Sequence, residues 1–261
     1  MLALLRFEFR KLFRNKAFYI CLGICVFLLV INTITNKVMA DMMYEEMKTA
    51  YEEIGMTYEY NFSALALIKT AFSSNTAIIE GVAVSIIVCE DFAADIIKNI
   101  YSKGYNRTQV YFAKLLSSLC AFLMILLGGM IISFLTGLAL TGQLGTVGKN
   151  YIGSVFCIYL LSIAYFAVYY AIAIIFKKVA PSIVLSILGP TGISILLVLG
   201  TMFIKNENVD LSNYWISGAM SNLSLTDVES KWITISIIVS ILVIAGFGAL
   251  SFFMHRRKDV K

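Results

Sequence analysis

Residues 115–148 read LLSSLCAFLMILLGGMIISFLTGLALTGQLGTVG, a run of 34 residues without any Asp, Glu, Lys or Arg. The hydrocarbon core of a membrane is about 30 Å thick, and about 20 helical residues cross it. The run is therefore long enough to form a membrane-spanning helix, which we expect over residues 112–140.

The composition of the whole chain agrees with this interpretation. Of its 261 residues, 59% are hydrophobic and 14% are charged, whereas about 25% of the residues in soluble domains are charged. A water-soluble fold of this size could not hide so much apolar surface. The composition excludes a disordered chain, a collagen-like chain and an ordinary soluble enzyme, and it predicts a polytopic membrane protein.

We predict an all-α membrane protein with six transmembrane helices in one domain, residues 1–261. Four further runs contain no charged residue, and another is interrupted only by Glu80. An even number of spans places both termini on the same side of the membrane. The five additional predicted spans are residues 17–36, 73–90, 151–176, 181–204 and 232–254.

The distribution of Lys and Arg predicts the orientation. Fifteen of these residues fall on the side of the two termini and six fall on the other side. Because cytoplasmic segments are enriched in Lys and Arg, we expect both termini, including the tail 255–261, in the cytoplasm. The chain is rich in Lys and Ile and poor in Pro, which indicates a bacterial source, so we expect it in the bacterial plasma membrane. Segments 37–72 and 205–230 would then be extracellular. Basic residues beside apolar spans are topology signals, so we expect no nucleic-acid partner.

Two segments outside the spans have amphipathic periodicity. Residues 1–16 place apolar side chains at three- and four-residue spacing, with cations elsewhere, which predicts a helix lying in the lipid interface. Residues 37–72 begin with an acidic amphipathic helix that should end near Gly55. Its apolar face could pack on the bundle as a cap, or the segment could act as an external gate or a docking surface for a cationic ligand.

The chain contains no recognisable catalytic, metal or nucleotide site. Residues 142–150 resemble a phosphate-binding loop, but the spacing of the glycines is wrong and Asn150 stands where Ser or Thr should contact magnesium. The single histidine, His255, leaves no acid–base set within the membrane. We therefore expect a chain that is not an enzyme and that holds no cofactor of its own.

Two features inside the spans are candidates for a translocation path. A charged carboxylate at the centre of a membrane helix is energetically unfavourable. Glu80 therefore either faces a cavity, or lies near the outer interface because the span begins later in the sequence. Gly189, Pro190 and Gly192 interrupt the fifth span. Such a break could be a hinge or line a cavity, or it could serve packing alone.

The segment Cys89–Leu116, CEDFAADIIKNIYSKGYNRTQVYFAKLL, predicts a short cytoplasmic helix between two spans, within residues 91–106. Phe92, Ile96 and Ile100 share one face of this helix, and Asp91 and Asp95 favour its N-terminus. Such a helix could lie on lipid or dock into the groove of a partner protein.

This segment resembles the permease subunits of type-2 ABC transporters, and especially a small six-span bacterial subgroup linked to bacitracin and lantibiotic resistance. The resemblance rests on residues 91–92, 97–100, 102, 107–108 and 113–116, and residues 8, 11–12 and 15–16 are similar to the family's interfacial elbow.

The resemblance implies that the short helix is a coupling helix seated on a separate ATPase subunit, which binds ATP and magnesium. A second permease chain, identical or homologous, would complete the transporter. The exported compound would be amphipathic or peptide-like, such as an antimicrobial peptide or antibiotic. The alternative is a non-transporting membrane sensor or assembly module that docks the same kind of ATPase. The implied ATPase contacts are Asp91, Phe92, Asp95, Ile96, Lys98, Asn99, Ile100 and Arg107, with a second contact at Lys177 and Lys178.

Overall fold

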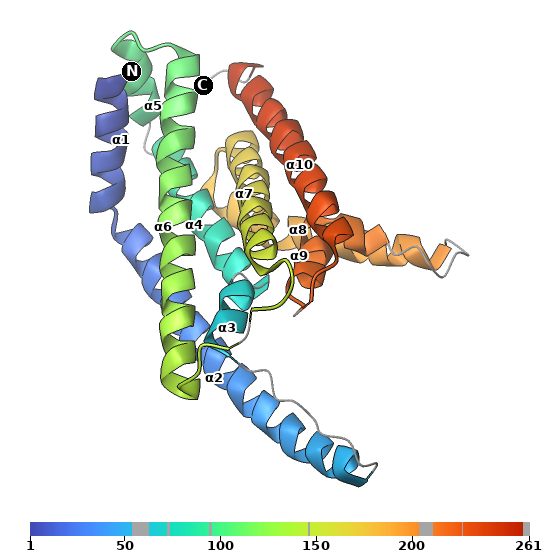
Figure 1. The fold of residues 1–261 in the computed structure, drawn as a ribbon. Coiled ribbons are helices and arrows are strands. Elements are labelled where there is room, and N and C mark those ends of the chain that lie inside the picture. The colour runs from blue at the N-terminus through green and yellow to red at the C-terminus, as the bar shows by residue number, and fades with distance from the viewer. Residues whose placement is uncertain are drawn as a thin grey trace.

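The protein is a bundle of helices (Figure 1), seen in a computed structural model that describes residues 1–53, 63–71, 74–93, 96–145, 147–203, 211–225 and 227–257. Within these ranges every regular element is helical, which confirms the predicted all-α class. The elements in chain order are α1 (Leu2–Arg14), α2 (Lys16–Glu53), α3 (Ala64–Thr70), α4 (Ser74–Ala93), α5 (Ile96–Ser102), α6 (Arg107–Thr141), α7 (Tyr151–Phe176), α8 (Val179–Phe203), the 3-10 helix η1 (Leu211–Tyr214), α9 (Ile216–Leu223) and α10 (Ser230–Arg257).

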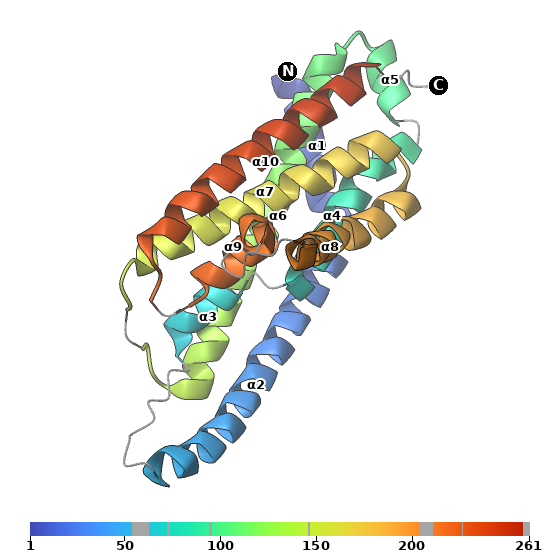
Figure 2. The same ribbon diagram turned by 90° about the vertical axis from the view of Figure 1, so that its right-hand side faces the viewer.

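Five helices in the described part of the chain are long and apolar enough to cross a membrane. They are α6, α7 and α8, together with Lys16–Tyr44 of α2 and Ser230–Arg256 of α10. These helices coincide with five of the six predicted spans and support a multi-pass membrane protein. The start of α1, all of α5 and the end of α10 lie at the same end of the molecule (Figures 1 and 2).

Helix α4 occupies the position of the remaining predicted span. It has 20 residues, and every stretch of 18 residues within it contains Glu80, Glu90 and Asp91, so it is not among the five apolar helices. It packs against α2, α6, α7 and α8, and its side chains at Val84 and Val88 are fully buried. Helix α4 is thus a central element of the bundle, and its passage through the membrane stays a prediction.

Helix α7 forms the centre of the main hydrophobic core. It packs against α4, α8, α9 and α10, and large side chains such as Leu161, Tyr169 and Ile174 are almost fully buried. The rings of Tyr165 and Tyr169 stack with their centroids 5.9 Å apart. Because α7 is covered by other helices on several sides, its side chains are mostly apolar around the whole helix, as expected for a helix surrounded by protein.

Helix α2 runs without a break from Lys16 to Glu53, so the boundary expected at residue 37 is absent. Its distal part extends away from the other helices (Figures 1 and 2), and the end predicted near Gly55 lies outside the described residues. The expectation that the apolar face of this part packs on the bundle is wrong for the side chains that can be described. Val38, Met39, Met42 and Met43 are between 51% and 66% exposed.

Small residues allow close packing on one face of α6. Gly129, Ser133 and Gly137 recur at four-residue spacing and are buried. A Cβ atom added at Gly137 would lie 2.5 Å from Cδ1 of Leu67 and 3.1 Å from the Cα atom of Ala64 in α3, whereas one added at Gly128 would meet nothing within 4 Å. Membrane helices commonly use small residues in this way to bring backbones together.

We therefore expect Gly137→Leu to destabilise the protein by about 1 to 3 kcal/mol, because overpacking would separate α3 from α6. Gly128→Leu makes the same chemical change in the same helix and should be neutral or slightly stabilising, since Leu is the better helix former. The measurement is thermal unfolding of the two purified variants in one detergent. Equal melting temperatures for both variants would contradict this account of the α3–α6 contact.

Candidate functional site

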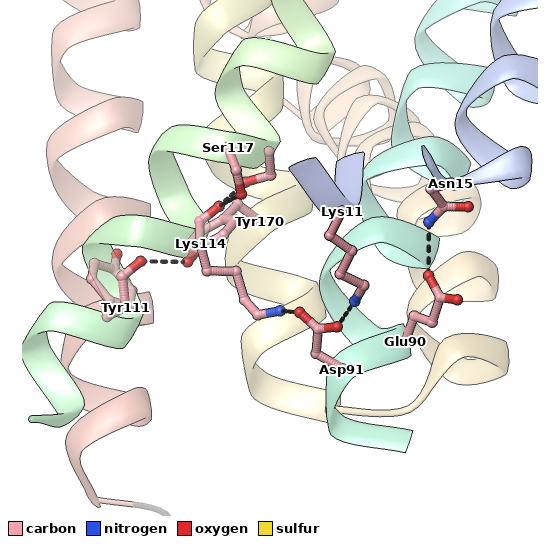
Figure 3. Close-up of polar contacts among 9 residues, drawn as sticks. Lys11, Asn15, Glu90, Asp91, Tyr111, Lys114, Ser117 and Tyr170 are labelled. Atoms are coloured by element: carbon pink, nitrogen blue, oxygen red, sulfur yellow. Dashed lines mark hydrogen bonds and ion pairs between the residues drawn. The ribbon is translucent and has the colours of Figure 1, made fainter. Parts of the chain in front are cut away.

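A buried carboxylate joins three helices at the end of the bundle where α5 lies. Asp91, near the end of α4, is 1% exposed. It forms ion pairs with Lys11 of α1 and with Lys114 of α6, which is itself 2% exposed (Figure 3). Unpaired buried charges are strongly unfavourable. The carboxylate and the two ammonium groups therefore stabilise one relative position of α1, α4 and α6.

Neighbouring polar groups support this ion cluster. Asn15, the residue between α1 and α2, donates a hydrogen bond from Nδ2 to Oε2 of Glu90 at 2.7 Å (Figure 3). Glu8 of α1 is also buried. Burial and the nearby Lys114 ammonium lower the pKa of Lys11, whereas Glu8 and Glu90 raise it. The carboxylates are thus the groups that favour the charged form of Lys11.

Phe92 links the cluster to the junction between α7 and α8. The ammonium of Lys177 lies 5.4 Å from the centroid of the Phe92 ring, and that of Lys114 lies 5.7 Å from it. Both distances are within the range of cation–π attraction. Lys177 ends α7 in the left-handed conformation, with φ of 56°, so the chain turns sharply there. Two segments that the sequence analysis named separately are thereby brought together.

Helix α5 packs its apolar side chains against its own chain. Ile97 and Ile100 are buried, and Ile100 belongs to a cluster with Leu4 of α1 and with Val110 and Ala113 of α6. Ile96 and Tyr101 are partly buried against the same cluster. The exposed residues of α5 are Lys98, Asn99 and Ser102. The outer surface of the helix is consequently polar.

The end of α10 contacts both sides of the α5–α6 connection. The Tyr101 hydroxyl lies 3.3 Å from Nε2 of His255, and the Arg107 guanidinium donates to the carbonyl oxygen of Arg256 at 3.0 Å. Burial raises the pKa of Tyr101, an effect that Arg107 opposes, so the hydroxyl stays protonated and can donate at neutral pH. His255, which the sequence analysis placed in the tail 255–261, belongs to α10 and is 3% exposed.

The predicted contact residues occupy several different environments. Asp91 and Phe92 belong to α4 and not to the short helix, because α4 continues to Ala93. Asp95 lies outside the described residues. Ile96, Lys98, Asn99 and Ile100 are in α5, Arg107 begins α6, and Lys178 is exposed beside Lys177. In the sequence analysis, Lys11 and Lys114 contribute only to the family resemblance and the predicted orientation, and Tyr101 has no role. No signal in the sequence pairs either lysine with Asp91.

Glu80 lies near the second turn of α4 and is 2% exposed. Its Oε2 atom has no hydrogen-bond partner in the described part of the protein. It lines a cavity of about 10 Å³ together with Thr76 and Tyr159, which is about the space that one water molecule needs. Glu80 is therefore buried within the bundle, and not at its surface.

A larger cavity of about 380 Å³ lies beside Pro190 and is lined by residues of α4, α7, α8 and α9. Glu80 is not among the residues that line this cavity. Helix α8 continues through Pro190, and the hydroxyl groups of Ser186, Ser194 and Ser217 are among the polar groups that line the cavity. Gly189 is half-buried beside Ile172, and a Cβ atom added at Gly192 would meet nothing within 4 Å.

The contact between α4 and α8 includes several small and polar side chains. Ser85 and Ser186 share a hydrogen bond of 3.0 Å, and Cys89 and Ser182 share one of 3.3 Å. A Cβ atom at Gly81 would lie 3.1 Å from Cβ of Ser186. Within each helix the contacting residues are four positions apart, so they lie on one helix face. They are Gly81, Ser85 and Cys89 in α4, and Ser182 and Ser186 in α8.

Comparison with known proteins identifies the family. The model of the ABC-2 family transporter proteins matches residues 4–192, which is more than half of the chain. The chain belongs to this family and is a permease component of an ABC transporter. No curated protein and no solved structure matches it. The matched region includes the ion cluster, α5 and the α7–α8 junction.

Replacement of Asp91 tests the ion cluster. Asp91→Asn leaves two buried or half-buried ammonium groups without their carboxylate, so we expect a loss of about 3 to 5 kcal/mol in the free energy of unfolding. Glu90→Gln, at the neighbouring exposed position, should cost about 1 kcal/mol or less. Reversible denaturation of the purified chain in mixed micelles measures both values.

A double variant distinguishes loss of charge balance from loss of packing. Asp91→Asn combined with Lys114→Met removes both the carboxylate and its most deeply buried partner. We expect this protein to regain part of the stability that Asp91→Asn loses. If the two effects simply add, the Asp91–Lys114 pair does not couple α4 to α6.

Proposed function

We propose that this chain is the membrane subunit of an ATP-driven exporter and that the outer face of α5 docks on a separate ABC ATPase. Permeases of the ABC-2 family in general act with such an ATPase. The observation that carries the proposal is the division of α5 into two faces. Its isoleucines hold it to α1 and α6, while Lys98, Asn99 and Ser102 face outward.

The packing of α5 supports a role in coupling. A docking helix that moves independently of the membrane helices could not transmit the motion of an ATPase to them. Helix α5 contacts α1 and α6 through Ile100 and α10 through Tyr101. Phe92, close to the start of α5, contacts Lys177 at the α7–α8 junction. A displacement of α5 would therefore act on several helix ends at once.

We propose an amphipathic or peptide-like compound as the substrate and a second permease chain, identical or homologous, as the partner within the membrane. The cavity beside Pro190 supports a substrate with both polar and apolar parts, because serine and tyrosine hydroxyls share its wall with aliphatic side chains such as Ile78 and Ile187. ATP and magnesium would be bound by the ATPase, and both termini of this chain would lie in the cytoplasm with α5.

Docking on the ATPase is tested with exposed residues of α5. Lys98→Glu should reduce the amount of ATPase that co-purifies with the chain by at least about tenfold, because reversing a charge in a docked face leaves unpaired charges in the interface. Arg6→Glu, an equal change at an exposed position of α1, should leave co-purification unchanged. The variant Ile100→Arg cannot test docking, because Ile100 is buried in this chain and its replacement would disturb the packing of α5 itself. Equal recovery of the ATPase with Lys98→Glu and wild type would exclude α5 as the docking surface.

Transport is measured in vesicles that contain this chain and its ATPase. We expect ATP-dependent accumulation of a fluorescent cationic amphipathic peptide, with loss of accumulation in Lys98→Glu and retention in Arg6→Glu. An ATPase that docks normally and hydrolyses ATP, without movement of any amphipathic compound offered, would favour the non-transporting alternative.

A further inference from the structure

A basic pocket lies at the bend between α1 and α2. Its volume is about 660 Å³. The bend arises at Asn15, which ends α1 in an extended conformation with φ of −78° and ψ of 114°. The cations Arg10, Lys11, Arg14 and Lys16 line the pocket together with the single carboxylate of Glu90.

The charges in this pocket are not balanced by the protein. Lys11 is paired with Asp91, and Glu90 accepts a hydrogen bond from Asn15. Arg10, Arg14 and Lys16 are exposed and have no carboxylate partner among the described residues. Arg10 and Arg14 are one turn apart on the same face of α1. Two guanidinium groups and an ammonium group converging on one space fit a phosphate or phosphodiester anion.

An exposed apolar stripe leads from the pocket along α2. Ala17 lines the pocket, and Ile20, Ile24 and Phe27 follow it at three- and four-residue spacing, each at least 47% exposed. This spacing places all four side chains on one helix face. The same part of α2 belongs to a helix apolar enough to cross a membrane. The stripe therefore faces a place that a hydrocarbon chain can occupy.

We propose that the α1–α2 bend binds an anionic glycerophospholipid. Its phosphodiester headgroup would lie between Arg10, Arg14 and Lys16, and an acyl chain would follow Ile20, Ile24 and Phe27. Phe7, which lines the pocket and is 46% exposed, would contact the glycerol end of the acyl chains. A bound lipid would bridge cations on α1 and α2 and so hold the elbow at one angle to the membrane helix. Free inorganic phosphate would use the same cations but not the stripe.

The test is lipid binding to the purified full-length chain by native mass spectrometry, with phosphatidylglycerol and phosphatidylcholine as probes. We expect retention of phosphatidylglycerol over phosphatidylcholine. A cation near an anionic lipid surface contributes about fivefold in affinity, so Arg10→Gln with Arg14→Gln should weaken phosphatidylglycerol binding about 25-fold. The matched control is Arg6→Gln with Lys103→Gln, which removes two exposed cations outside the pocket and should have little effect.

Further measurements separate the lipid from its competitors. Phe27→Ala should weaken phosphatidylglycerol binding while leaving the binding of inorganic phosphate unchanged. The proposal is overturned if phosphatidylglycerol binding survives the Arg10 and Arg14 substitutions, if phosphatidylcholine binds equally well, or if inorganic phosphate at the same concentration displaces the lipid. It is also overturned if Ile24→Cys yields disulfide-linked dimers of this chain, because a second copy would then occupy the stripe.

Discussion

The arrangement of helices around α5 depends on one carboxylate, that of Asp91, held between the ammonium groups of Lys11 and Lys114. Two of these three charges are almost completely buried, and a buried charge is tolerated only beside its partners. The cluster thereby restricts α1, α4 and α6 to one mutual arrangement. Helix α5 packs on the same elements through Leu4 of α1 and Val110 of α6. Its position follows from the position of the ion cluster, and not from any strong preference of a seven-residue helix to form alone.

From this cluster the contacts extend to the remaining long helices. Phe92 reaches the α7–α8 junction through Lys177, and Tyr101 reaches α10 through His255. The hydroxyl of Tyr111 in α6 pairs with Ser251 of α10 at 2.7 Å. The Tyr170 hydroxyl donates to the Tyr111 carbonyl oxygen at 3.2 Å (Figure 3). One end of the bundle is thus connected by ionic, aromatic and hydrogen-bonded contacts, which is the property that a coupling surface requires.

The sequence predicts most of the helices because length and apolar composition are sufficient to define a membrane span. The continuity of α2 was also predictable, since no Gly or Pro occurs between Gly23 and Gly55. The partners of Asp91 were not, because Lys11 and Lys114 are 80 and 23 residues away along the chain and Lys11 is one of several similar cations in α1. Nor does periodicity alone reveal that Ile100 faces its own chain, because an apolar face is equally suited to an intramolecular or an intermolecular contact.

The middle of the bundle contrasts with its ionic end. Between α4 and α8 the contacts include those of Gly81, Ser85 and Cys89 with Ser182 and Ser186. Large interdigitated side chains resist a change of register because each shift opens voids, whereas small residues let two helix backbones approach closely and serine hydroxyls form hydrogen bonds between the helices. Helix α8 also contains Pro190, which lacks the backbone N–H that would tie it to the preceding turn. In the proposed coupling, a displacement applied at the ionic end would reach the contact between α4 and α8 beside the cavity at Pro190, because α4 carries both Asp91 and Ser85.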